Sequence, residues 1–141
     1  MSRMIFVNFP VSDLPKAMKF YEAIGFTNNP QFTDDSAAAM VLTDVIHVML
    51  LTHDRWQSFT TRPLPAAGSS EVMVCISCDG RDEINQMLDT VAANGGTSDI
   101  NPVQDHGFMF SRSFTDPDGH VWEAMWMDAA VATGETQASA A

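Results

Sequence analysis

The chain has 141 residues, of which 45% are hydrophobic and 18% are charged, so its composition is that of a folded globular protein rather than a disordered one. No apolar run reaches the roughly 18–20 residues of a membrane-spanning helix, and the N-terminus lacks a signal-peptide pattern, so we expect a cytoplasmic protein. Eighteen acidic and seven basic residues give a net charge of −11, and residues 69–141 hold twelve of the acids but only two of the bases. We therefore expect neither nucleic acid nor an anionic membrane as a partner.

A strand followed by a helix opens the chain. Residues 4–9 are rich in aromatic and β-branched side chains and predict a strand that ends before Pro10. The pair Ser12-Asp13 is typical of a helix cap, and Gly25 is typical of a helix end. Between them, apolar residues recur at helical spacing: Leu14, Ala17, Met18, Tyr21 and Ile24.

Three short extended segments complete the first half, at residues 29–33, 37–43 and 45–52. Residues 55–70 are polar and rich in Pro, Gly, Ser and Thr, which predicts a connection between two halves.

The second half repeats this order. A strand at residues 72–77 precedes a second helical stripe, formed by Ile84, Met87, Leu88, Val91 and Ala92. Two closing strands follow, at about 108–114 and 120–127, and the turn sequence Asp116-Pro117-Asp118-Gly119 joins them as a hairpin.

The repeated order predicts an α+β fold of two βαβββ modules, residues 3–64 and 69–128, within a single domain over residues 1–128. Each module has one helix, which can cover one face of its mixed sheet. We expect the two uncovered faces to face each other around a ligand-binding cleft. Residues 129–141 are small, polar and aperiodic, and predict a disordered tail.

The only two cysteines, Cys75 and Cys78, form a C-x-x-C sequence that begins in the predicted strand at 72–77 and ends just after it. A redox-active pair of this kind needs a helix N-terminus to lower the thiol pKa. Residues three apart on a strand point to opposite faces, so we predict two structural thiols rather than a disulfide.

Glu123 is the candidate catalytic residue. Both faces of its strand are otherwise apolar, so we expect a buried carboxylate that needs a cation, strong hydrogen-bond donors or a proton. It would act as a general base or a ligand-binding carboxylate in the cleft, or else form a buried structural salt bridge. Arg112, in the neighbouring strand, could hold a substrate carboxylate, or pair structurally with Glu123 or Asp116.

Three further residues are candidates for binding a substrate: His106, Asn8 and Met125. His106 lies beside a glycine at the start of a strand, where it reaches the cleft mouth or stays in a surface loop. Asn8 shares a strand face with Phe6, where it orients a polar ligand or bonds a strand edge. Met125 falls in a predicted strand, so it belongs to the core or to a pocket for a flat apolar ligand.

Several of these residues resemble the sequence motifs of a known protein family. The segments Val11-Ser12-Asp13-Leu14, Phe20-Tyr21 and Gly25-Phe26, followed by the run from Asp116 to Glu123, resemble the vicinal oxygen chelate superfamily. This group includes glyoxalase I, bleomycin-resistance and fosfomycin-resistance proteins, and extradiol dioxygenases. The likeness spans residues 3–128 and is greatest to the uncharacterised branch labelled predicted lactoylglutathione lyase.

The resemblance implies four metal-ligand positions, which fall on Phe6, on or next to Leu50, near Met73, and on Glu123. Only Glu123 can bind a hard cation, because phenyl and alkyl groups cannot ligate and a thioether is a poor ligand for Zn²⁺, Ni²⁺ or Fe²⁺. We therefore expect no cofactor, and Phe6, Leu50 and Met73 become candidate substrate contacts. A divalent metal would need a rearranged set of ligands that includes Glu123, His106 and a further histidine.

Two functions follow from the resemblance. The first is a glyoxalase- or dioxygenase-like enzyme that acts on a small oxygenated or thiol-conjugated metabolite, in the manner of a lactoylglutathione lyase. The second is a metal-free binding protein of the bleomycin-resistance type, in which Glu123 meets the cationic group of a small-molecule ligand. Proteins of this kind commonly pair, so the resemblance also implies a homodimer.

Overall fold

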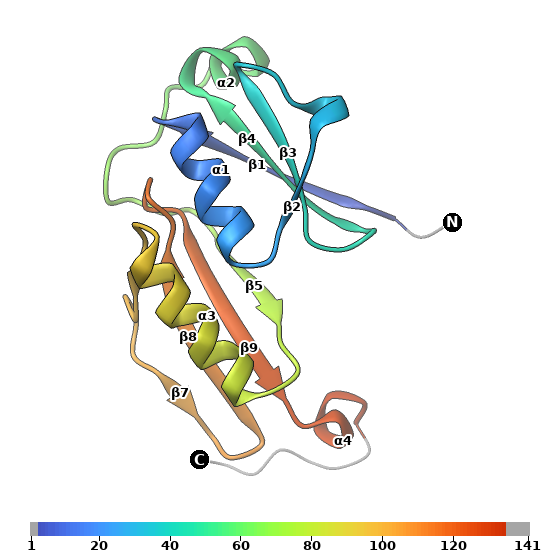
Figure 1. Cartoon of the computed structure of the whole chain (residues 1–141). Helices are drawn as coiled ribbons and strands as arrows, with labels where there is room; N and C mark the ends of the chain where they lie inside the picture. Colours follow the sequence, from blue (N-terminus) through green and yellow to red (C-terminus); the bar gives the residue numbers. More distant parts are fainter. Residues whose placement is uncertain (1–2, 135–141) are drawn as a thin grey trace. The chain divides into compact units, whose positions relative to one another are not determined.

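The computed structural model describes residues 3–134 and contains two mixed sheets, each accompanied by one long helix (Figure 1). The chain divides into two compact units. Among the described residues, the first comprises 3–69 together with 117–119, and the second comprises 70–116 together with 120–134. Within the part of the chain described, no helix is long and apolar enough to cross a membrane.

The first unit holds a four-stranded sheet in the order β1-β4-β3-β2, in which β1 and β4 are parallel and the other pairs are antiparallel. Its strands are β1 (Ile5–Val11), β2 (Thr27–Asn29), β3 (Ala37–Val41) and β4 (Ile46–Thr52). Its helices are α1 (Leu14–Ala23), the 3₁₀ helix η1 (Pro30–Phe32) and α2 (His53–Phe59).

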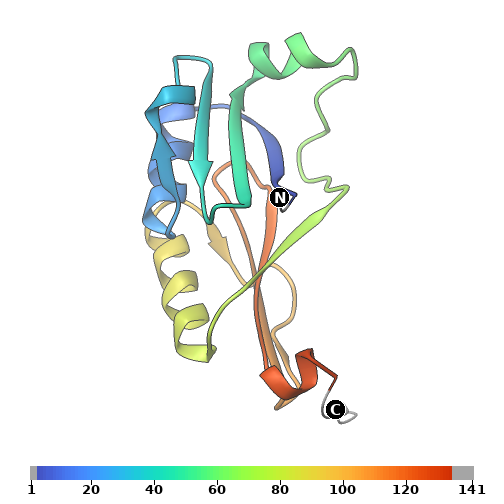
Figure 2. The same cartoon turned by 90° about the vertical axis from the view of Figure 1, so that its right-hand side faces the viewer.

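Helix α1 covers one face of this sheet (Figure 2). Its N-terminus is capped by Asp13, whose Oδ1 accepts a hydrogen bond of 3.1 Å from the backbone N–H of Lys16. The side chains between α1 and the sheet are fully or almost fully buried: Phe20, Tyr21, Met40, Val48 and Leu50. This apolar layer is the core of the first unit.

The second unit repeats the same strand order as β5-β9-β8-β6, with a short additional strand β7 that pairs with β8. Its strands are β5 (Met73–Ser77), β6 (Thr97–Ser98), β7 (Gln104–Asp105), β8 (Met109–Thr115) and β9 (Val121–Met127). Its helices are α3 (Arg81–Ala93) and α4 (Ala129–Ala132). The parallel pair β5–β9 corresponds to the parallel pair β1–β4 of the first unit.

Helix α3 covers one face of the second sheet (Figure 1). Phe114 and Trp122, neighbours on β8 and β9, stack with ring centroids 6.3 Å apart. They are buried together with three residues of the helix: Ile84, Leu88 and Val91. Every second residue of β5, β8 and β9 contributes to this layer, and the alternate residues lie on the opposite face.

The α+β class and the two βαβββ modules predicted from the sequence are confirmed. That the uncovered faces enclose a cleft stays a prediction. Four local predictions were wrong. Residues 30–32 of the predicted extended segment at 29–33 form the 3₁₀ helix η1. Strand β1 continues through Pro10 to Val11, residues 53–59 form α2, and residues 129–132 form α4 rather than part of a disordered tail. The rest of the predicted tail, residues 135–141, lies outside the described residues.

Candidate functional site

Glu123 lies on the face of the second sheet opposite α3. In register it stands between Ser113 of β8 and Cys75 of β5, whereas its chain neighbours Trp122 and Ala124 are buried on the α3 side. Its carboxylate is half-buried, and Oε2 accepts one long hydrogen bond of 3.5 Å from the Ser111 hydroxyl. The expectation of a fully buried carboxylate was therefore wrong, because one face of β9 is not covered by its own unit.

We refer to this surface as the Glu123 face. It is built from β5, β8 and β9 and is largely apolar or weakly polar, with Glu123 as its only charged residue. Its members are Met73, Cys75, Ser77, Met109, Ser111, Ser113, Thr115, Val121, Glu123, Met125 and Met127. The predicted contact residues Met73 and Met125 both belong to it, and Met73 is 58% exposed.

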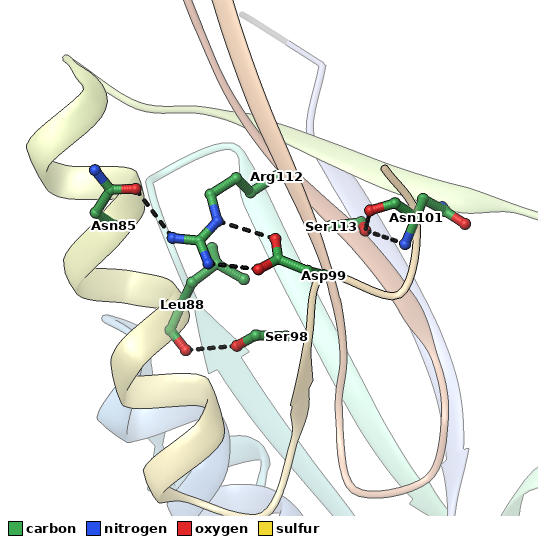
Figure 3. Close-up of polar contacts among 7 residues, drawn as sticks. All are labelled: Asn85, Leu88, Ser98, Asp99, Asn101, Arg112 and Ser113. Carbon is green, nitrogen blue, oxygen red and sulfur yellow. Dashed lines mark hydrogen bonds and ion pairs between the residues drawn. The ribbon is translucent and has the colours of Figure 1, made fainter. Parts of the chain in front are cut away.

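Arg112 lies on the α3 side of the sheet and pairs with neither Glu123 nor Asp116. Its Nε and Nη2 donate hydrogen bonds of 2.9 and 2.6 Å to the carboxylate of Asp99, and its Nη1 donates one of 3.0 Å to Asn85 Oδ1 (Figure 3). The predicted structural pairing of Arg112 with Glu123 or Asp116 is therefore wrong, whereas its binding of a substrate carboxylate stays a prediction. The Arg112 guanidinium lowers the pKa of Asp99, and its own side chain is only 19% exposed.

Arg81, the other basic residue of the second unit, also lies on the α3 side. Its guanidinium donates to both carboxylate oxygens of Asp105, at 2.8 and 2.9 Å, and lies over the rings of Phe110 and Trp126. The hydrogen bond from Arg81 holds the pKa of Asp105 at about 2. Both arginines of the second unit are thus bonded on the face away from Glu123.

His106 lies on the same side of the second sheet as Glu123 but far along it. Its backbone N–H donates to the carbonyl of Met109 at 2.9 Å, and its Nε2 is 3.2 Å from Gln104 Oε1. Met109 is four residues from Ser113, the register partner of Glu123, which corresponds to about 13 Å along the strand. His106 therefore does not contact Glu123 directly.

Phe6 and Asn8 lie on the face of the first sheet opposite α1. Phe6 is 51% exposed and stacks on His47 with ring centroids 4.6 Å apart. Asn8 is the register partner of Met49, and its side-chain amide donates to the Phe6 carbonyl at 3.3 Å. Leu50 was predicted as a contact residue, but it is 0% exposed beneath α1. The residues of β4 that share the face of Phe6 are His47, Met49 and Leu51, and Met49 is the one beside Asn8.

Both cysteines are free thiols, as predicted. Cys75 is exposed on the Glu123 face, and Cys78 is buried. Partial burial, and secondarily the charge of Glu123, raises the pKa of Cys75. Burial raises the pKa of Cys78 to about 11, with smaller contributions from nearby acids. Neither thiol has the lowered pKa of a redox-active cysteine.

Ser111, Ser113 and Cys75 surround Glu123, although the sequence pattern predicts no part in the site for any of them. The signal that could have found them is strand register. The hairpin turn at 116–119 places Ser113 opposite Glu123, and the parallel pairing places Cys75 on its other side.

The residues at the positions implied by the family for metal ligands do not fit a metal ion. Phe6, Met49 and Met73 offer a ring and two thioethers, so Glu123 is the only hard donor among them. Within residues 3–134, no three His, Cys, Asp or Glu side chains come together as a metal-binding group. Binding or catalysis at this site therefore depends on Glu123 and its neighbours.

Two successive modules with this strand order, each with one helix-covered face, define the βαβββ class of fold. The chain belongs to the glyoxalase/bleomycin resistance protein/dioxygenase superfamily, whose family model matches residues 3–124. No curated protein matches the sequence.

Solved structures show the same fold. A glyoxalase/bleomycin resistance protein/dioxygenase family enzyme from Burkholderia phytofirmans is 13% identical with a TM-score of 0.77, covering 89% of this chain and 99% of that one. A hypothetical protein from S. aureus is 25% identical with a TM-score of 0.75, covering 89% and 95%. The fosfomycin resistance protein FosX from Mesorhizobium loti is 16% identical with a TM-score of 0.67, covering 94% and 98%.

Proposed function

We propose that this protein binds a small amphipathic organic cation without a metal, as bleomycin-resistance proteins do within this superfamily. The cation would lie against the Glu123 face, with its positive group on the carboxylate of Glu123. The protein would act in the cytoplasm as a homodimer, a state that light scattering on the purified protein can test.

The observation that supports this proposal most is that no positively charged side chain of residues 3–134 pairs with Glu123. A half-buried carboxylate is stabilised by a cation or by strong donors, yet from residues 3–134 Glu123 accepts only one hydrogen bond, of 3.5 Å, from Ser111. The two arginines of the second unit are held by Asp99 and Asp105 on the other side of the sheet. A cationic ligand would supply the missing charge.

The surroundings of Glu123 favour an amphipathic ligand over a bare ion. Thioethers from Met73 and Met125 and the thiol of Cys75 provide polarisable, adaptable contact area. The net charge of −10 over residues 69–141 attracts cations and disfavours a multiply anionic ligand such as a glutathione conjugate.

A lactoylglutathione lyase-like reaction is the second candidate, because Glu123 supplies a carboxylate at one of the four ligand positions that the resemblance implies. In that case Glu123 would act as the general base on a small oxygenated or thiol-conjugated metabolite. Turnover of methylglyoxal with glutathione, together with an equivalent of divalent metal in the purified protein, would favour this function and contradict the proposal.

The proposal is tested with two probes that differ in charge, 3-methylbenzylamine and 3-methylbenzyl alcohol, titrated by calorimetry or NMR. We expect the wild type to bind the amine about 10–100-fold more tightly, since hydrogen bonds to charged groups contribute on the order of 1.5–3 kcal/mol. Glu123→Gln should remove this preference.

The matched control is Asp89→Asn, which removes the same charge from an exposed position on α3. It should keep the preference for the amine. Equal binding of the amine by wild type and Glu123→Gln would show that the carboxylate does not hold the cation, and the proposal would fail.

A further inference from the structure

The segment between β6 and β7 passes from the α3 side of the second sheet to the Glu123 face. Asp99 bonds Arg112 on the α3 side, whereas the backbone N–H of Asn101 donates to the Ser113 hydroxyl at 2.8 Å on the other side (Figure 3). The crossing is made at Asp99, which has a φ of 58°. Asp is among the few residues that adopt this left-handed conformation readily.

Asn101 then reaches across β9. Its side-chain Nδ2 lies 3.8 Å from the sulfur of Met73, which belongs to β5, whereas Ser113 belongs to β8. Strand β9 runs between these two strands. Because Ser113 is the register partner of Glu123 and Met73 that of Val121, the Asn101 side chain lies over β9 beside Glu123.

The carboxamide of Asn101 makes no strong hydrogen bond to another group among residues 3–134. A thioether is a weak acceptor for its N–H₂ group. Among residues 3–134, its Oδ1 has no polar contact, and the side chain is exposed. The hydroxyl of Ser113 is already occupied, since it accepts from the Asn101 backbone N–H and donates to the Asn101 carbonyl.

Besides the hydroxyl of Thr115 and the thiol of Cys75, this end of the Glu123 face therefore presents a carboxylate and a carboxamide to a ligand. The carboxylate accepts hydrogen bonds and attracts positive charge. The carboxamide can both donate and accept, so it recognises a carbonyl or an amide. A ligand that satisfies both must carry a cationic nitrogen and a carbonyl-bearing group on one small apolar frame.

We infer that Asn101 determines the specificity of this site by binding a carbonyl or carboxamide group of the cation held by Glu123. The inference rests on the proposed function and narrows it from amphipathic cations in general to those that carry a carbonyl. The ion pair of Asp99 with Arg112 anchors the segment that presents Asn101.

The test compares 3-(aminomethyl)benzamide with 3-methylbenzylamine, two probes with the same ring and ammonium group that differ in the carboxamide. We expect the wild type to bind the carboxamide probe about fivefold more tightly, the gain typical of one hydrogen bond. Asn101→Leu should remove that gain, so that the ratio of the affinities for the two probes falls to about one. In NMR spectra, the side-chain N–H₂ signals of Asn101 should shift with the carboxamide probe alone.

The matched control is Gln86→Leu, which removes a carboxamide from an exposed position of α3. It should bind both probes as the wild type does. If the wild type prefers the carboxamide probe and Asn101→Leu keeps that preference, or if the wild type shows no preference, the role of Asn101 is overturned while the role of Glu123 stands. If neither probe binds the wild type, both proposals fail.

Discussion

The two units share one strand order but differ in what their uncovered faces carry. In the first, the parallel pair of strands brings Asn8 beside Met49, and the corresponding pair in the second brings Cys75 beside Glu123. The first sheet has no Asp, Glu, Lys or Arg on the face opposite α1. The helix-covered faces are alike in both, so burial against the helix specifies the fold and leaves the other face free to carry chemistry.

The largest expected effect concerns the two covered faces. Leu50→Ala in the first unit and Phe114→Ala in the second should each lower the free energy of unfolding by about 2–5 kcal/mol, because each removes a fully buried side chain. Urea unfolding of the variants measures this loss.

Met49→Ala is the control, one residue along β4 on the opposite face. It should cost much less than Leu50→Ala, because Met49 is only half-buried. A loss at Met49 as large as that at Leu50 would mean that the faces of β4 are assigned the wrong way round.

A smaller effect should appear in the pH dependence of folding stability. It should come from the second unit, because the pairs Arg81–Asp105 and Arg112–Asp99 lie there. Arg81 lowers the pKa of Asp105 from 3.8 to about 2. An acid whose pKa is lower in the folded than in the unfolded protein stabilises the fold at pH values above its unfolded pKa. This stabilisation is lost as the pH falls from about 4 towards 2. The wild type should therefore lose more stability over this range than Asp105→Asn.

The measurement is the urea midpoint of both proteins at several pH values between 2 and 6. Asp82→Asn, which removes an exposed acid of α3, serves as the control and should follow the wild type. Parallel curves for wild type and Asp105→Asn would show that the exposed pair with Arg81 contributes nothing to stability.

The smallest expected effect concerns the negative charge of Glu123, which the corresponding face of the first sheet lacks. Glu123 contributes to the raised pKa of Cys75, after the larger effect of partial burial. Glu123→Gln should therefore increase the thiolate fraction at pH 8 and speed alkylation of Cys75 by iodoacetamide roughly twofold.

Mass spectrometry after timed quenching follows the two thiols separately. Cys78 is buried, so its slower alkylation should not change in Glu123→Gln. An unchanged rate at Cys75 would show that the charge of Glu123 does not reach this thiol.

The sequence was sufficient for the parts of the fold that repeat a pattern. Helices α1 and α3 span ten and thirteen residues, long enough for their apolar stripes to be evident. Helices α2 and α4 span only seven and four residues, which is too short for a periodic pattern, and their start depends on single caps at Thr52 and Asp128.

The candidate site was harder to predict because it depends on register and on a long-range partner. A shift of one residue exchanges the two faces of a strand, which is why Leu50 was placed where Met49 lies. Arg112 was expected to pair across the hairpin, but its partner Asp99 becomes available only after β6 pairs with β8 and the chain turns at a positive φ. Neither event leaves a local signal in the sequence.

The four methionines of the Glu123 face make it sensitive to oxidants. Met73 and Met125 lie near the carboxylate of Glu123, and Met109 and Met127 lie farther along the same face; all four side chains are exposed or half-buried. Conversion of a thioether to a sulfoxide turns a flexible apolar contact into a polar, chiral one. Oxidation by peroxide would thus make this surface more polar and leave the packed layer beneath α3 unchanged. Methionine sulfoxide reductases would reverse this damage.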